Sequence, residues 1–155
     1  YQNMQLTLAL HPSESLERMM ARLLAYCLNA QEYIQFTRGL STPNEPDIQA
    51  VALDEEMLLW IDVGEPSAER IKKATRKARK VRVYSFNSKT DEWWSQEGKK
   101  MRQLDAEIFK FHWSEIQGLA RLVERRMDIS VTISGHHAYV SMNQGEQDIH
   151  WELLT

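Results

Sequence analysis

A continuous apolar stretch that ends in an acid is the feature that most constrains the fold of this chain. Met57–Val63 has the sequence MLLWIDV, which is β-prone and apolar on both alternating faces except at Asp62. Such a strand needs protein cover on both faces, as the central strands of mixed sheets have. Pro66 and Ser67 then begin a predicted helix that runs to about Arg79. The sequence therefore predicts a buried central strand with an acid at its end.

The charge of the chain changes sign directly after this strand. Residues 39–69 contain eight carboxylates and no lysine or arginine, whereas residues 70–82 contain eight lysines and arginines and no carboxylate. Segregated charge at the end of a strand suits a place where metal ions and phosphates meet. The net charge of −3 argues against nucleic-acid binding through bulk charge. Any such binding has to use a local patch.

The remaining pattern predicts a single α+β domain over residues 1–155. Strands are predicted at 5–10, 31–37, 57–63, 81–86 and 107–112, with a C-terminal β-meander at 129–133, 138–142 and 149–154. Helices are predicted at 13–29, at 66–79, after a cap at Asn87 or Ser88, and after a capping box of Ser114 and Gln117. The expected architecture is a mixed central sheet flanked by helices.

Several functional classes are disfavoured by what the sequence lacks. The single cysteine, Cys27, excludes an internal disulfide and fits a reducing compartment such as the cytoplasm. No apolar run has the length needed to cross a bilayer and no signal peptide is visible, so we expect no membrane partner. The five histidines, His136 and His137 among them, show no metal-ligand spacing with a cysteine, and we expect them to have structural or surface roles.

The first helix and the central strand each carry a carboxylate that needs a partner. Glu17 falls within the apolar stripe of the helix, while Arg18 and Arg22 are predicted to point to solvent. The alternative is that Glu17 is a first-turn glutamate that interacts with the helix dipole. Asp62 ends a buried row, where active-site groups of α/β sheets often lie. The alternative for Asp62 is a cap on the following turn.

The basic helix offers several cations to this strand end. Arg70 and Lys72 flank its buried side, whereas Lys73 faces solvent. If a lysine reaches back to Asp62, the helical geometry favours Lys72. The alternative is that the whole run is a solvated helix face. Before the strand, Glu45-Pro46-Asp47 forms a predicted turn from which both acids can project.

Several segments together resemble the bacterial YaeQ family. They are HPSESLERMMARLLA, QFTRGL, EPD, LWIDVGEPSAERIKKA, YSFNS and the Trp93-Trp94 pair. YaeQ proteins resemble a variant of the PD-(D/E)xK nuclease fold. The resemblance therefore implies a restriction-endonuclease-like core.

The resemblance also implies a set of catalytic acids. Glu17 corresponds to the acid of the first helix, Asp47 to the aspartate of the Pro-Asp pair, and Asp62 to the strand acid. Such carboxylates hold Mg²⁺. The expected metal ligands are Asp47 and Asp62, with Glu45 as the alternative second acid.

The chain departs from the superfamily pattern at the lysine. Gly64 stands where the superfamily has lysine, two residues after the strand acid. Lys72 could supply the ammonium group from a migrated position on the following helix. Phosphate contacts are expected from its basic residues: Arg70, Lys73, Arg76 and Lys77.

Two functional hypotheses follow from these observations. The first is a metal-dependent phosphodiesterase that acts on DNA or RNA. The second is a catalytically inactive nuclease-fold module that binds protein or nucleic acid. Gly64 and the net negative charge favour the second, whereas the placement of Glu17 and Asp62 beside the basic run favours the first.

Overall fold

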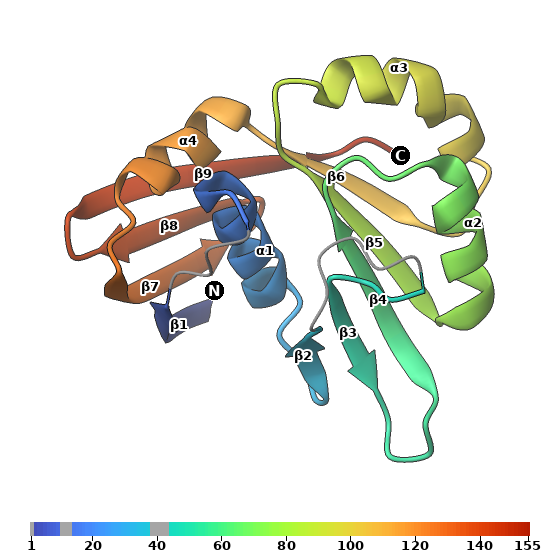
Figure 1. The fold of residues 1–155 in the computed structure, drawn as a ribbon, viewed down its shortest axis with the longest axis horizontal. Helices are drawn as coiled ribbons and strands as arrows, with labels where there is room; N and C mark the ends of the chain where they lie inside the picture. Colours follow the sequence, from blue (N-terminus) through green and yellow to red (C-terminus); the bar gives the residue numbers. More distant parts are fainter. Residues whose placement is uncertain (1, 10–13, 38–43) are drawn as a thin grey trace.

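One curled sheet and four helices make up the described part of the chain, which in this computed structural model is residues 2–9, 14–37 and 44–155 (Figure 1). The strand order of that sheet is β1-β7-β8-β9-β6-β5-β4-β3-β2. The strands are β1 (Gln2–Ala9), β2 (Ile34–Phe36), β3 (Ile48–Val51), β4 (Met57–Val63), β5 (Lys80–Ser85), β6 (Glu107–Phe111), β7 (Arg126–Ser134), β8 (His137–Met142) and β9 (Gly145–Leu153). The helices are α1 (Leu16–Leu28), α2 (Ala68–Lys77), α3 (Thr90–Met101) and α4 (Trp113–Arg121). The predicted mixed α+β class is confirmed.

The centre of the sheet is parallel and its two sides are antiparallel. β4 pairs with β5, and β5 with β6, in parallel register. Parallel neighbours need crossover connections, which α2 and α3 supply. On β4, Leu59 and Ile61 lie in the core cluster that includes α1, whereas Trp60 lies in the cluster formed with α2 and α3. The prediction of a central strand covered on both faces is therefore confirmed.

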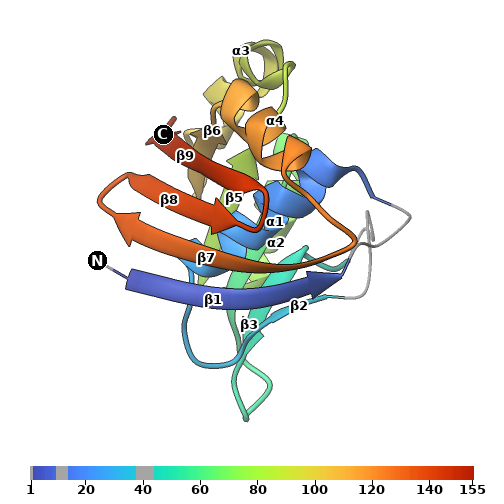
Figure 2. The same ribbon diagram turned by 90° about the vertical axis from the view of Figure 1, so that its left-hand side faces the viewer.

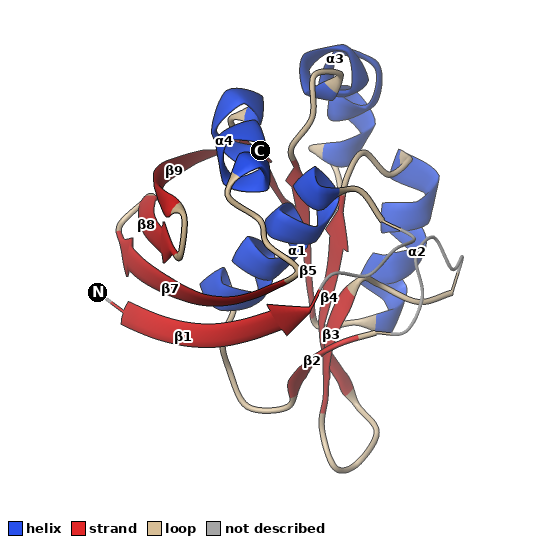
Figure 3. Cartoon of the chain, turned by 60° about the vertical axis from the view of Figure 1, so that its left-hand side comes forward, coloured by secondary structure: helices blue, strands red, loops and turns tan. Residues whose placement is uncertain are grey.

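The helices form two layers on opposite faces of the sheet. Figures 1 and 3 show α1 across the concave side, with α4 beside it, and α2 and α3 on the other side. Figure 2 shows β1, β7, β8 and β9 as one curved layer. β9 joins this layer to the parallel strands, because His150 pairs with His137 of β8 while Trp151 pairs with Phe111 of β6. The predicted C-terminal meander is confirmed, and it is continuous with the central sheet.

The ends of several helices differ from the predictions. α1 has Ser15 as its N-cap, whose hydroxyl accepts a hydrogen bond from the backbone N–H of Arg18 at 3.1 Å; the predicted cap, Ser13, lies outside the described residues. The capping box at Ser114 is wrong, because α4 already begins at Trp113 and its N-cap residue, His112, makes no side-chain cap bond.

Two further local features were not anticipated. The N-cap of α3 is Lys89 rather than Asn87 or Ser88, because Asn87 forms a tight turn just before the helix and accepts the N–H of Lys89 at 2.8 Å. β3 was not predicted at all. It has only four residues and follows a Pro-containing turn, so its alternation is too short to register as a strand.

The burial of Cys27 and the lengths of the helices test two of the expectations from the sequence. Cys27 is buried on α1, and burial raises the pKa of its thiol to about 12. A thiol of this kind is not a nucleophile at neutral pH. Among the described residues, no helix is long and apolar enough to cross a membrane.

Candidate functional site

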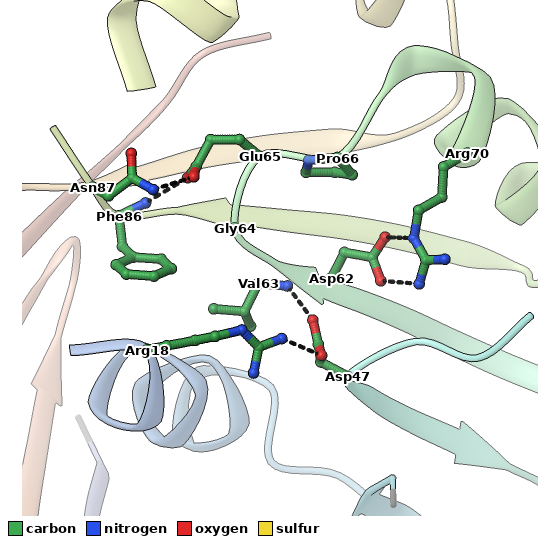
Figure 4. A pocket seen from close by; sticks show the side chains of 10 residues that line it. All are labelled: Arg18, Asp47, Asp62, Val63, Gly64, Glu65, Pro66, Arg70, Phe86 and Asn87. Carbon is green, nitrogen blue, oxygen red and sulfur yellow. Dashed lines mark hydrogen bonds and ion pairs between the residues drawn. The ribbon is translucent and has the colours of Figure 1, made fainter. Parts of the chain in front are cut away.

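A pocket of about 530 Å³ opens at the end of β4, where the parallel strands stop (Figure 4). Its walls come from α1, the turn before β3, the end of β4, the first turn of α2 and the segment after β5. The lining residues are Arg18, Asp47, Asp62, Val63, Gly64, Glu65, Pro66, Arg70, Phe86 and Asn87. The pocket therefore brings three carboxylates and two guanidinium groups together. Strand ends of this kind are common ligand sites in sheets with parallel strands.

Asp62 and Arg70 form the most regular contact in this pocket. The guanidinium donates to both carboxylate oxygens, from Nε to Oδ2 at 2.7 Å and from Nη2 to Oδ1 at 3.2 Å. Arg70 is placed there because Ser67 caps α2, so that its side chain leaves the first turn of the helix toward β4. Nη2 also donates to the backbone carbonyl of Glu45 at 2.6 Å. Asp62 is thus held by a cation rather than by a turn.

The acidity of Asp62 reflects this buried position. Only 3% of the residue is exposed. Burial raises the pKa of its carboxyl, the hydrogen bonds and charge of Arg70 lower it, and the neighbouring charge of Asp47 raises it again. The net direction is upward, because desolvation outweighs the guanidinium. The same pairing raises the pKa of Arg70 above its ordinary value.

Asp47 is buried beside Asp62 and is held from two sides. Its Oδ2 accepts the backbone N–H of Val63 at 2.8 Å, which fixes the carboxylate at the end of β4. Its Oδ1 accepts a hydrogen bond from Nη2 of Arg18 on α1. The backbone of Asp47 also donates to the carbonyl of Ile61 at 2.9 Å. The carboxylate is therefore rigidly placed toward the pocket.

Arg18 is itself oriented by a buried acid. The side chain of Glu14 is only 1% exposed and accepts hydrogen bonds from Nη1 of Arg18 at 2.9 Å and Nη2 of Arg22 at 2.6 Å. Arg18 therefore bridges Glu14 and Asp47. The prediction that Arg18 and Arg22 point to solvent is wrong. The flank of the helix that carries these arginines also meets protein, because Arg18 reaches Asp47 before β3 and the guanidinium of Arg22 lies over the ring of Phe36 on β2, 4.9 Å from its centroid.

Glu65 forms the opposite wall of the pocket. Its Oε2 accepts the hydroxyl of Ser85 at 2.6 Å and the backbone N–H of Phe86 at 3.3 Å, and its Oε1 accepts the side-chain amide of Asn87. These bonds tie the end of β4 to the end of β5. Sequence reasoning did not select Glu65. The only hint in the sequence was that Glu65 stands three residues after Asp62, just before α2.

Comparisons with known proteins point to one family over nearly the whole chain. The YaeQ protein family matches residues 1–151. This chain belongs to the YaeQ family. It is 38% identical to "Uncharacterized protein YaeQ" of Salmonella typhi over 88% of this chain and 76% of that protein, and 34% identical to its Escherichia coli (strain K12) counterpart over 93% and 81%. Crystal structures of YaeQ proteins from Pseudomonas syringae and Xanthomonas axonopodis pv. citri superpose with TM-scores of 0.89 and 0.87 at 31% and 32% identity. They cover 100% and 99% of this chain, which spans 87% and 88% of theirs.

Of the acids implied by the YaeQ resemblance, two meet in the pocket and two do not. Asp47 and Asp62 lie together, as described above. Glu17 is half-buried in the first turn of α1 and does not line the pocket. Glu45 is exposed and contributes only its backbone carbonyl, through Arg70. Within the described ranges, no three His, Cys, Asp or Glu side chains already converge on a point that could hold a metal ion.

Of the basic residues of α2, one reaches the pocket and the others do not. Lys72 is exposed and lines a separate groove between α2 and α3, near Glu97 and Lys100, so it is Arg70 and not Lys72 that reaches Asp62. Lys73, Arg76 and Lys77 are exposed. Lys73 and Lys77 line a smaller pocket of about 260 Å³ that also contains Trp60 and Arg70. The exposed basic surface therefore adjoins Arg70 on the outer side of α2.

The backbone explains why glycine stands at position 64, where the nuclease resemblance led us to look for a lysine. Gly64 has φ +129°, and its N–H donates to the carbonyl of Tyr84 at 2.8 Å. A side chain there would meet no atom within 4 Å, so the obstacle is the conformation and not the space. Residues other than glycine rarely adopt such a φ. The turn that links the pocket to α2 therefore excludes lysine at this position.

We expect Gly64→Asn to lower the free energy of unfolding by about 2 kcal/mol, because it forces a side chain into this backbone conformation. Gly135→Asn is the matched control. Gly135 has φ +60°, which asparagine tolerates, and it also has open space around it. Urea unfolding of both variants measures the difference. Equal losses at the two positions would refute a strained backbone at Gly64.

Proposed function

We propose that this chain is a metal-dependent phosphodiesterase on a restriction-endonuclease-like core, with Asp47 and Asp62 as its metal ligands and Arg70 as its phosphate-facing cation. The observation that carries the proposal is the meeting of two buried carboxylates, one from the turn before β3 and one from β4, with two arginines in one pocket. Buried carboxylates so close that one raises the pKa of the other are typical of sites that bind a cation. Pockets of paired acids beside cations suit phosphoryl chemistry.

The donor set fits Mg²⁺ or Mn²⁺ better than it fits a softer ion. Mg²⁺ takes oxygen ligands, keeps several of its waters and is commonly held by one or two carboxylates together with substrate phosphate. Asp47 and Asp62 provide that number without Glu17 or Glu45. When bound, such an ion supplies an activated water and stabilises charge on the phosphodiester.

The arginines give the site its second component. Arg18 and Arg70 now neutralise the same carboxylates that a metal would use. A divalent ion that took over this neutralisation would leave the guanidinium nitrogens that now bond Asp47 and Asp62 available to the phosphate, with which arginine forms bidentate hydrogen bonds. Arg70 then fills the role that the superfamily gives to lysine, and Lys72, in its separate groove, does not.

Nucleic acid is the substrate class that the surrounding charge favours. Lys73, Arg76 and Lys77 extend the cationic surface from Arg70 along the exposed side of α2. Three phosphate contacts predict a slope of roughly −3 for log affinity against log salt concentration. A flat salt dependence would remove nucleic acid from the substrate list.

Cleavage of plasmid DNA and of single-stranded RNA, with Mg²⁺ or Mn²⁺, tests the proposal. We expect Asp47→Asn and Asp62→Asn each to lower the rate by at least about 100-fold, since each removes a ligand of the ion that activates water. Arg70→Lys should also lower it. Lys72→Gln, which changes a cation on the same helix outside the pocket, is the matched control and should leave the rate unchanged. Cleavage that survives both aspartate substitutions does not belong to this site.

A second candidate is a non-catalytic module that binds nucleic acid or a protein partner. The observation that favours it is that both pocket aspartates are already paired with arginine. Calorimetry with Mn²⁺ separates the two candidates. Binding that is lost in Asp62→Asn supports the phosphodiesterase. Absence of Mn²⁺ binding, with salt-dependent nucleic-acid binding retained, supports the module.

A further inference from the structure

Two histidines lie opposite each other on adjacent strands, and a third lies just past the end of the next strand. His137 on β8 is directly opposite His150 on β9. His112 follows Phe111 of β6, which pairs with Trp151 of the same β9. Their strand neighbours Ala138, Ile149 and Trp151 are buried in the core, and alternate side chains of a strand point to opposite faces. His137 and His150 therefore occupy the face of the sheet that points away from that core.

The rings of His137 and His150 are spaced as two ligands of one ion would be. Their centroids are 4.8 Å apart with an interplanar angle of 41°. With metal–nitrogen bonds of about 2.0–2.1 Å, two imidazoles at neighbouring positions of one ion have centroids roughly 4.5–5.3 Å apart. The ring of His112 lies farther off, at 6.4 Å from that of His150. The pair, rather than the row of three, has the spacing of a site.

Each ring of the pair is also bonded to a carboxylate through one nitrogen. Nε2 of His137 lies 2.8 Å from Oδ1 of Asp148, and Nδ1 of His150 lies 2.9 Å from Oε2 of Glu115. An ionised carboxylate only accepts hydrogen bonds, so these nitrogens are assigned as the N–H donors. When the ring is neutral, its other nitrogen carries a lone pair. Metal-binding histidines characteristically have a carboxylate partner of this kind, which fixes the tautomer.

Glu115 is itself held in place for this contact. Its other oxygen, Oε1, accepts the backbone N–H of His150 at 2.7 Å, so α4 is tied to β9 at the histidine pair. The two imidazole side chains are 38% and 51% exposed, for His137 and His150 respectively. They are therefore open to an ion with its waters.

We propose that His137 and His150 form a surface site for a borderline first-row transition-metal ion, of the class of Zn²⁺, Ni²⁺ and Cu²⁺, completed by water and oriented by Asp148 and Glu115. Imidazole nitrogens suit these ions, whereas Mg²⁺ prefers oxygen. The site is distinct from the aspartate pocket in both place and ligand chemistry, and it does not depend on the proposed phosphodiesterase activity.

Calorimetric titration of the tag-free chain with Zn²⁺ at pH 7.5 tests this inference. We expect His137→Ala and His150→Ala each to weaken binding by at least about 10-fold, because each removes one of two ligands. His136→Ala is the matched control: this neighbouring histidine lies against the ring of Trp151 and should leave the affinity unchanged. Asp62→Asn should also leave it unchanged, which separates this site from the pocket.

Two further readouts bear on the ligands themselves. Binding should weaken from pH 7.5 to pH 5.5, because protonated imidazole cannot coordinate a metal. Histidine ring nitrogens observed by NMR should shift with Zn²⁺ for His137 and His150. Absence of Zn²⁺ binding at millimolar concentration, or binding that survives both His137→Ala and His150→Ala, would overturn the proposal.

Discussion

Arg70→Met is expected to lower the free energy of unfolding by about 2–3 kcal/mol at pH 7, because it leaves the buried carboxylate of Asp62 without its cation. Both oxygens of that carboxylate now accept hydrogen bonds from the guanidinium. Loss of one partner from a fully buried pair costs about 3–5 kcal/mol. The side chain of Arg70 is 25% exposed, so we place the effect just below that range. Urea unfolding monitored by tryptophan fluorescence measures the loss.

Two variants control this experiment. Lys72→Met changes an exposed cation of the same helix to the same residue, and we expect its effect to stay within about 0.5 kcal/mol. Asp62→Asn introduced together with Arg70→Met should recover most of the loss, because no buried charge then remains unpaired. Equal losses in Arg70→Met and Lys72→Met would contradict the pairing.

The pair of Asp62 and Arg70 also makes a contribution to stability that depends on pH. The pKa of Asp62 in the folded chain is raised above its ordinary value of 3.8, chiefly by burial. The folded chain therefore holds a proton on Asp62 in a pH range where the unfolded chain has lost it. This contribution to stability is complete below the unfolded pKa and is lost as pH rises through the folded pKa. The unfolding free energy of the natural chain, minus that of Asp62→Asn, should thus fall with rising pH above 3.8. A difference that rises over this range would contradict the expected shift.

The sequence predicts well those parts of the fold that local patterns determine. Met57–Val63 has the predicted bounds, because a continuous apolar run with turn residues on both sides leaves little choice of secondary structure. Asp62 follows from that strand, whereas the choice of Asp47 rests on the resemblance, with Glu45 left as the alternative. Both aspartates lie in the pocket because the antiparallel register pairs Ile48 with Ile61 and so sets the start of β3 beside the end of β4.

The parts that were missed depend on contacts between elements. Helical periodicity places Arg18 opposite the apolar stripe of α1, but it carries no information about a sheet that curls around the helix. Lys72 lies on the flank of α2 predicted for it, yet that flank faces α3 and not β4. The pair of His137 and His150 exists only through the register of β8 with β9. No periodicity along the chain could have revealed it.

Phe111→Ala is expected to lower the free energy of unfolding by about 3–5 kcal/mol, since it opens a cavity where the two halves of the sheet meet. Phe111 is 1% exposed, its ring stacks on that of Tyr84 at 5.4 Å, and it meets Trp151 edge-on at 6.3 Å. Phe111 and Trp151 are also register partners between β6 and β9. The same side chain therefore supports the parallel strands and the strand that joins them to the curved layer.

Phe109→Ala is the matched control for this effect. Phe109 lies two residues earlier on β6, is half-buried and stacks on the same Tyr84 at 5.0 Å, but its register partner is Leu153, which is 46% exposed. We expect a loss of about 1–2 kcal/mol, because less surface is uncovered. Hydrogen exchange adds a spatial test: Phe111→Ala should lower protection in β8 and β9 as well as in β6, whereas Phe109→Ala, whose partner lies at the exposed end of β9, should leave protection in β8 unchanged. A loss of protection confined to β6 in Phe111→Ala would mean that the two halves of the sheet are stabilised independently of this joint.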